Sequence, residues 1–240
     1  GAMHVPKPKI APCEPWTLTE LLNYEKEVTG MFMSGHPLDH FRFELKHYEI
    51  TNIADFNEVR DALVEGSSLG KMYRVAGLVT DVQHRMTKTG KNFGSFVIED
   101  YSGKTEYMLW SEDYIKYKDY LEKGQNILLN GYFRNRYNQP NLFEFKISSM
   151  SLLETVKQQL TRSVEINMHP SAVTPAMVGF IEKNLKTYPG KSTLRINIME
   201  PKENLKISMY TIERGFQMNE EMADYLMNNL DVEVKVGLVS

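Results

Sequence analysis

Seven residues near the middle of the chain have the chemistry to bind a polyanion through charge and ring stacking. Five are cations and two are aromatic, and they gather around two polar stretches, residues 85–92 and 134–141. Cations in such positions neutralise phosphates and release counterions, and exposed rings stack on bases. The pattern therefore predicts binding of a nucleic-acid strand with little sequence preference. The seven candidates are Arg85, Lys88, Lys91, Phe93, Arg134, Arg136 and Tyr137.

The elements that must hold these residues read as five strands, with a helix between the third and the fourth. Residues 112–121 have the apolar spacing of that helix. This order is that of the OB-fold, a small Greek-key barrel that binds oligonucleotides on strands 2 and 3, between the loops after strands 1 and 4. Here those two loops are the cationic stretches. The expected strands are residues 73–82, 93–99, 105–110, 126–133 and 142–147.

Each of these assignments has an ordinary alternative. Loop cations often form only a solvated surface, and most aromatic residues of a small barrel fill its interior. Alternation along a strand places Phe96 and Ile98 in the core, whereas Phe93 could lie on the binding face or inside. Trp110, at the end of the third strand, is a further ring on which a base could stack.

A helical segment and a small α+β domain flank the expected barrel. The later residues follow the order β-α-β-β-α-β, with helix N-caps expected at Thr174 and Asn219 and a connector at residues 153–160. Gly1-Ala2-Met3 looks like the scar of a cleaved tag and suggests a fragment of a longer chain. The predicted fold is thus multidomain α+β. The expected parts are a lead-in at 1–15, a helical segment at 16–70, an OB-fold β-barrel at 71–152, and an α+β domain at 160–240.

The charge of the chain is unevenly distributed. The 240 residues carry a net charge of −3, which divides into −5 for residues 1–70, +3 for 71–152 and −1 for 153–240. Only the expected barrel is net basic, as a strand-binding domain should be. No apolar run approaches the roughly 20 residues of a membrane span, so no membrane is expected. The single cysteine, Cys13, favours a reducing compartment, and the predicted location is the cytoplasm.

The sequence offers no group of residues typical of catalysis. His36 and His40 are four residues apart, but Pro37 lies between them and further metal ligands are missing. Ser34 lies near His36 without the glycine-flanked turn of a hydrolase nucleophile. There is also no phosphate-binding or dinucleotide-binding glycine loop. We therefore expect no catalytic residue, metal ligand or cofactor in this chain.

Several motifs resemble the alpha, or catalytic, subunit of bacterial replicative DNA polymerase III. Residues 30–39, Gly-Met-Phe-Met-Ser-Gly-His-Pro-Leu-Asp, are similar to a segment that lies just ahead of the OB domain in that family. The last part of the chain resembles the C-terminal domain of the subunit, which contacts the tau subunit of the clamp loader. Motifs similar to the family's OB domain are Ala76–Val79, Met86–Lys91, Glu99–Gly103 and Glu106–Trp110.

The resemblance implies a noncatalytic fragment of a protein that acts in DNA replication. The parent would be a DNA-directed DNA polymerase, a nucleotidyltransferase, whose catalytic aspartates and sliding-clamp motif lie upstream of this chain. The helical segment would join the polymerase core to the OB domain. Single-stranded template DNA would be bound through the barrel, and tau would be contacted by the C-terminal domain. The cations that carry over are Arg85, Lys88, Lys91, Arg134 and Arg136.

Two other functions remain open. The barrel could be a protein-interaction scaffold, with the acidic flanking segments repelling DNA. Alternatively, the chain could be a tRNA-binding appendage or a small nuclease, although a nuclease would need the catalytic cluster that the sequence lacks.

Overall fold

The computed structural model describes residues 21–22, 35–211, 215–229 and 231–239. The chain separates into two compact units, residues 1–37 and residues 38–240. The expected tag scar, lead-in and most of the helix after Trp16 lie outside the described residues. All elements discussed below belong to the second unit.

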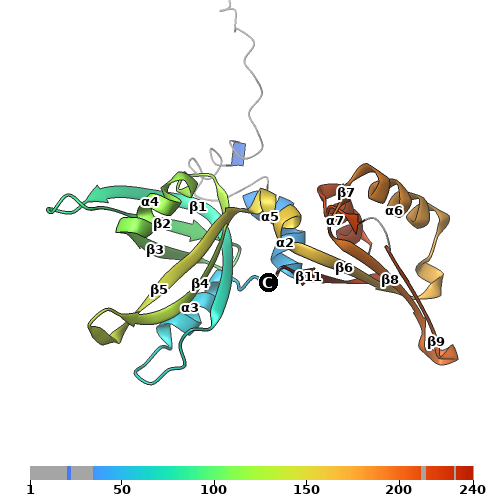
Figure 1. Ribbon diagram of the computed structural model, residues 1–240, viewed down its shortest axis with the longest axis horizontal. Coiled ribbons are helices and arrows are strands. Elements are labelled where there is room, and N and C mark those ends of the chain that lie inside the picture. The colour runs from blue at the N-terminus through green and yellow to red at the C-terminus, as the bar shows by residue number, and fades with distance from the viewer. Residues whose placement is uncertain (1–20, 23–34, 212–214, 230, 240) are drawn as a thin grey trace, which may run out of the picture. The chain divides into compact units, whose positions relative to one another are not determined.

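A five-stranded antiparallel sheet forms the first part of this unit (Figure 1). The strands lie in the order β3-β2-β1-β4-β5, and a helix follows the third strand, as the sequence predicts. A short 3₁₀ turn, η2, ends the expected helix early. The elements are β1 (Met72–Met86), β2 (Asn92–Glu99), β3 (Lys104–Trp110), α4 (Ser111–Tyr117), η2 (Lys118–Tyr120), β4 (Asn126–Arg136) and β5 (Gln139–Leu152).

An aromatic core fills the interior of this barrel. Its centre is Phe56 of helix α3 (Ile53–Asp61), which begins at the N-cap Asn52. The Phe56 ring stacks on Phe133 at a centroid distance of 5.2 Å and meets Phe145 edge-on at 4.9 Å. The barrel core is therefore completed by a helix that precedes the five strands.

Gly77, inside β1, marks a close approach between two strands. A Cβ atom there would lie 2.9 Å from the carbonyl oxygen of Glu99, at the end of β2. Glycine alone permits this approach without displacing the backbone. The register between β1 and β2 shifts two residues further on, between Val79 and Asp81.

The strands extend into both stretches predicted as loops, which corrects the expected boundaries: 134–141 is largely strand, whereas 85–92 keeps a five-residue connection. β1 continues through Arg85, and only residues 87–91 separate it from β2. Between β4 and β5, Tyr137 and Asn138 alone form the turn. The sequence looked loop-like because a two-stranded ribbon exposes polar side chains on both faces. Pro140 is tolerated because β5 is an edge strand with one free side.

Residues 153–160 form helix α5 (Leu153–Leu160), so the expectation of a plain connector is wrong. Leu153 and Val156 are fully buried and join the core of the C-terminal domain. That core also contains residues of η1 (Pro37–Phe41) and α2 (Arg42–His47). The described part of the N-terminal helical segment is therefore shared between two cores, α2 in one and α3 in the other.

The C-terminal domain is a four-stranded sheet with the order β11-β6-β8-β9. β6 and β8 are parallel and the other pairs are antiparallel. Thr174 and Asn219 cap α6 and α7 through their side-chain oxygens, as predicted. The elements are β6 (Thr161–Met168), η3 (Pro170–Ala172), α6 (Pro175–Thr187), β7 (Pro189–Gly190), β8 (Thr193–Glu200), η4 (Pro201–Glu203), β9 (Leu205–Tyr210), β10 (Gly215–Phe216), α7 (Glu220–Asn228) and β11 (Val232–Leu238).

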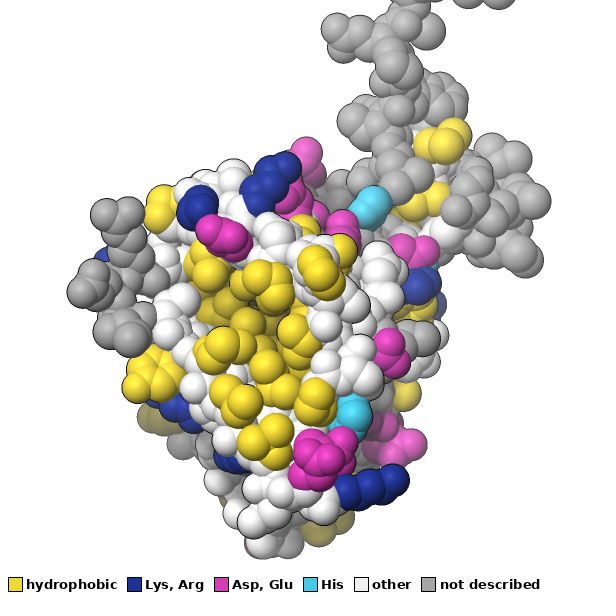
Figure 2. Space-filling view, turned by 90° about the vertical axis from the view of Figure 1, so that its right-hand side faces the viewer, with side chains coloured by type: hydrophobic (Ala, Val, Ile, Leu, Met, Phe, Trp, Pro, Cys, Tyr) yellow, Lys and Arg dark blue, Asp and Glu magenta, His cyan; other side chains and the backbone are white. Residues whose placement is uncertain are grey.

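Hydrophobic side chains remain exposed on one face of this domain and surround a hollow (Figure 2). The hollow has a volume of about 350 Å³ and lies between α6 and the β8–β9 pair. Ile196 and Ile198 of β8 line it together with Met177 and Ile181 of α6 and Met209 of β9. The edge strand β9 is exposed at all six positions, so α6 leaves this side of the sheet uncovered.

A buried ion pair ties three helices to the C-terminal core. The ammonium of Lys157, on α5, binds the carboxylate of Glu44 on α2, and it also lies 2.7 Å from a carboxylate oxygen of Glu220 on α7. Glu44 is completely buried and Lys157 nearly so. Burial raises the pKa of Glu44, and the hydrogen bond from Lys157 opposes that rise. Each charge is stable at this depth only because the other is present.

Replacing Lys157 by alanine should destabilise the protein by about 3–5 kcal/mol, because it leaves the Glu44 carboxylate buried without its counter-charge. The loss is measured from urea unfolding followed by circular dichroism. Lys123→Ala is the matched control, since it breaks an exposed pair with Asp81 and should change stability little. Equal losses in the two variants would contradict a structural role for the buried pair. The double change Glu44→Leu with Lys157→Met should recover most of the stability.

Candidate nucleic-acid interface

The outer face of β1, β2 and β3 carries a row made of one cation and two aromatic rings. The strand register places Arg85 beside Phe93, and Phe93 beside Trp110. The two rings are stacked, with centroids 4.8 Å apart and planes inclined by 14°. Trp110 keeps 43% of its surface exposed. The row therefore offers a flat apolar platform with a positive charge at one end.

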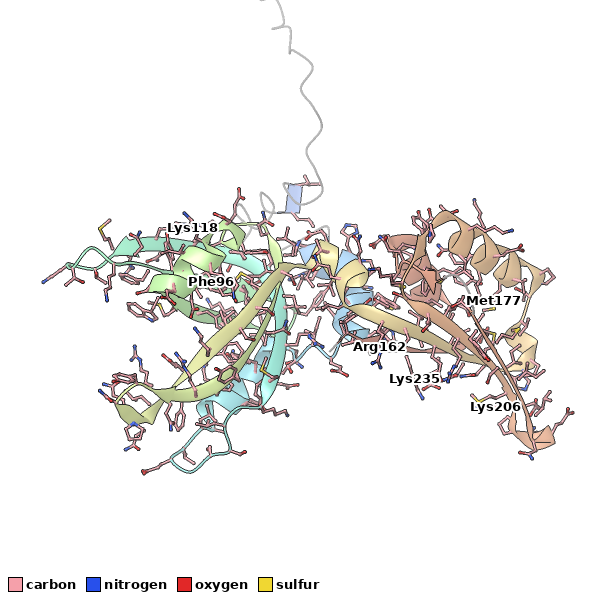
Figure 3. The ribbon with its side chains drawn as sticks, viewed as in Figure 1. Phe96, Lys118, Arg162, Met177, Lys206 and Lys235 are labelled. Carbon is pink, nitrogen blue, oxygen red and sulfur yellow. The ribbon has the colours of Figure 1, made fainter. Side chains whose placement is uncertain are left out.

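The structure resolves the alternatives that alternation left open for β2. Phe96 is 1% exposed and Ile98 is fully buried, so both belong to the barrel core. Figure 3 shows Phe96 within the barrel. Phe93 is only half-buried and lies on the opposite face of β2, with Trp110. The candidate rings are thus on the surface and available for stacking.

Two lysines lie at the tight turn between β1 and β2. The backbone N–H of Thr87 donates to the carbonyl of Lys91 at 2.8 Å, and Gly90 adopts a left-handed φ of 80° that closes the turn. The side chains of Lys88 and Lys91 are exposed. Neither forms an ion pair within the described part of the chain, so both charges are available to an anionic ligand.

The cations of the β4–β5 ribbon differ from one another. Arg134 donates from Nε to Oε1 of Glu144 at 2.7 Å, and its Nη2 forms an ion pair with the same oxygen, also at 2.7 Å. Its charge is therefore already compensated, which the sequence did not indicate. Arg136 has no carboxylate partner among the described residues, and Tyr137 at the tip is 90% exposed. Of the second group, Arg136 and Tyr137 are therefore the candidates whose side chains are free of ion pairs with described residues.

The two groups of candidates meet at a hollow between β3 and β5. Trp110 of the first group and Arg136 of the second both line it. Arg60 of α3 and Phe143 of β5 also line it, and neither was among the residues singled out from the sequence. The alternation of Phe143 with Phe145 was the available signal for the second of these. Nothing in the local sequence of α3 indicated that Arg60 would lie beside the third strand.

The described residues contain no group of three or more His, Cys, Asp or Glu side chains placed to hold a metal ion. Within the same part of the chain, no helix has the length and apolar character needed to cross a membrane.

Two protein families match this chain. Residues 73–153 match the family described as OB-fold nucleic acid binding domain, and residues 164–237 match the C-terminal domain of the DNA polymerase III alpha subunit. The chain therefore contains a region similar to OB-fold nucleic acid binding domains, followed by a region similar to the C-terminal domain of the DNA polymerase III alpha subunit. Its resemblance to the C-terminal region of the bacterial DNA polymerase III alpha subunit is confirmed.

Curated relatives named DNA polymerase III subunit alpha support this assignment. The Haemophilus influenzae protein is 26% identical over 77% of this chain and 15% of its own length. The Escherichia coli K12 protein is 31% identical over 50% of this chain and 10% of its own length. The Bacillus subtilis protein is 25% identical over 84% of this chain and 17% of its own length. The chain thus spans less than a fifth of these relatives.

Among solved structures, the mitochondrial single-stranded DNA binding protein Rim1 of S. cerevisiae is similar over 35% of this chain and 93% of its own. The sequence identity is 12% and the TM-score is 0.27. A score this low does not bear on function.

The compensated charge of Arg134 leads to a test of the interface. Glu144→Gln should free Arg134 for a phosphate, so single-stranded DNA should bind more tightly. The slope of log Kobs against log salt should steepen by about 0.7, the contribution of one phosphate contact. Fluorescence anisotropy of a labelled oligomer over a salt series measures both effects. Glu122→Gln is the control: it removes the same charge at a position outside the β4–β5 ribbon. It should leave the slope of log Kobs against log salt unchanged. Equal slopes for the two variants would show that Arg134 does not reach the DNA.

Proposed function

We propose that the OB domain of this chain binds single-stranded template DNA during replication. The observation that carries the proposal is the outward row of Arg85, Phe93 and Trp110 on β1, β2 and β3. A base that extends the Phe93–Trp110 stack gains about 1–3 kcal/mol, whatever its identity. Lys88 and Lys91 at the adjacent turn supply charge for the phosphates. Binding of this kind follows the backbone and reads no sequence.

The proposed role is that of a noncatalytic part of a larger polymerase. The match covers less than a fifth of the curated relatives, and we assign polymerase chemistry, a nucleotidyl transfer, to the regions outside it. Contact with the sliding clamp is likewise assigned to an upstream region. In this proposal the protein works in the cytoplasm, where the chromosome of a bacterium is copied, and needs no cofactor of its own.

The triple change Arg85→Ala, Lys88→Ala and Lys91→Ala tests this role. Affinity for a labelled single-stranded oligomer should fall on the order of tenfold at low salt, because three phosphate contacts are lost. The salt slope should fall by about 2. Fluorescence anisotropy measures both quantities.

The control for this triple change removes the same charge from the C-terminal domain, at Lys183, Lys186 and Lys191. That variant should bind as the unmodified chain does. Unchanged binding in the Arg85 triple variant would rule out the proposed site. If the unmodified chain binds no oligomer at low salt but still binds tau, the barrel is a protein scaffold instead.

We also propose that the C-terminal domain contacts the clamp-loader tau subunit through the hydrophobic hollow beside β9. Ile207 and Met209 of β9 pair with Ile198 and Ile196 of β8, so their side chains share one face of the sheet. Both remain nearly half exposed. Exposed apolar surface of this extent beside an open strand edge is typical of a docking site for a partner segment.

An acidic residue in this row should weaken the contact. Ile207→Glu should reduce tau affinity at least tenfold, because a carboxylate would be buried against apolar side chains without a partner. Isothermal titration calorimetry with purified tau measures the change. Lys206→Glu, on the opposite face of the same strand (Figure 3), is the matched control and should leave affinity nearly unchanged. Equal effects of the two changes would exclude this face as the tau site.

A further inference from the structure

A hollow opens between β3 and β5, the two outer strands of the barrel sheet. These strands do not pair with each other in the described structure, since each is hydrogen-bonded on one side only. The hollow has a volume of about 250 Å³. Pockets for drug-sized ligands have roughly 300–1,000 Å³, so this one suits a single flat ring system.

Aromatic side chains form the walls of the hollow, and some of these rings are held in place by contacts with neighbouring rings. Phe145 is held edge-on by Phe56 at 4.9 Å and by Phe133 at 5.1 Å. Phe143, two residues earlier on β5, is half-buried and is not part of the barrel core. Trp110 lies at the rim and is partly exposed. The entrance therefore has two partly exposed rings, and the floor includes Phe145, whose ring is packed against its neighbours.

The hollow also contains a buried polar group without a partner. Tyr107 lines it and is 4% exposed, and its hydroxyl forms no hydrogen bond with any described residue. Burial raises the pKa of Tyr107, so the hydroxyl stays neutral and able to donate. Most buried polar groups in native proteins are paired, so an unpaired one calls for an explanation. A ligand with an acceptor on its ring edge would satisfy this hydroxyl.

The charged side chains that line the hollow indicate which charged group a ligand would need. Arg136 of β4 lines the hollow and has no carboxylate partner among the described residues, whereas Arg60 of α3, which also lines it, is paired with Asp61 at 2.8 Å. Two acidic residues, Glu106 and Glu144, also line the hollow, and the carboxylate of Glu144 is neutralised by Arg134. The guanidinium of Arg136 beside a flat aromatic slot matches a ring attached to a phosphate better than a neutral peptide side chain.

We propose that the hollow between β3 and β5 takes one unstacked nucleobase of a bound single strand, with the base beside Phe143 and Trp110, its ring edge hydrogen-bonded by Tyr107, and a neighbouring phosphate on Arg136. The proposal rests on the proposed binding of single-stranded DNA and adds a defined seat for one base. The Phe93–Trp110 platform leads directly to this seat, because Trp110 belongs to both.

The test compares two short oligomers of equal length, one with bases and one built only of abasic sugar-phosphate units. The unmodified chain should bind the base-bearing oligomer at least tenfold more tightly. Phe143→Ala should lower that affinity about tenfold and leave the abasic affinity unchanged. Tyr107→Phe removes only the hydroxyl and should lower the base-bearing affinity a few-fold. Tyr210→Ala, which removes an exposed ring from the C-terminal domain, should alter neither affinity.

The outcomes separate this proposal from the function on which it rests. If neither oligomer binds the unmodified chain, the proposed DNA binding is itself wrong. If both bind and the Phe143 and Tyr107 variants match the unmodified chain, the seat is wrong and DNA binding stands. Equal losses for both oligomers in the Phe143 variant would place backbone rather than a base in the hollow and also overturn the proposal. Tyr107→Phe retains the ring, so it tests the seat even if Phe143→Ala unfolds.

Discussion

The packing of Phe56 inside the barrel is the contact on which the nucleic-acid surface depends. This one ring, from a helix before the barrel, lies within 5.7 Å of ring centroids on three strands, those of Tyr107 on β3, Phe133 on β4 and Phe145 on β5. An interior filled in this way holds β3 and β5 apart. The outer face of β3 and the hollow beside it therefore exist because a helix supplies part of the core.

The C-terminal domain has a second core. Unlike the aromatic core of the barrel, this one contains a buried ion pair. Lys157 and Glu44 are buried among apolar side chains of α2, α5 and α7. Such a pair contributes little net stability compared with apolar residues of the same size, but it requires a specific geometry of its partners. A hydrogen bond of 2.6 Å between the buried Tyr48 hydroxyl and Thr161 acts beside it. Together these polar contacts fix where helix α2 meets the first residues after α5.

The sequence predicted the succession of five strands with a helix after the third, the caps of α6 and α7, and the core positions Phe96 and Ile98, because these follow from periodicity and local hydrogen bonding. It could not assign a side of the sheet to Phe93, since one bulge reverses an alternation argument. The pairing of Arg134 with Glu144 depends on the register of a hairpin whose turn is only two residues long. Helix α5 was missed because its buried face includes a lysine, which reads as a polar position in any apolar pattern.

The free edge of β9 affects how the chain behaves in solution when no partner protein covers that edge. A strand with one free edge and exposed apolar residues is a template for strands of any origin, including a second copy of itself. The β9 strand has one lysine, Lys206, and no proline among its six residues. The features that make this edge suitable for recruiting another protein also expose it to aggregation. Occupancy of β9 would then protect the solubility of the chain.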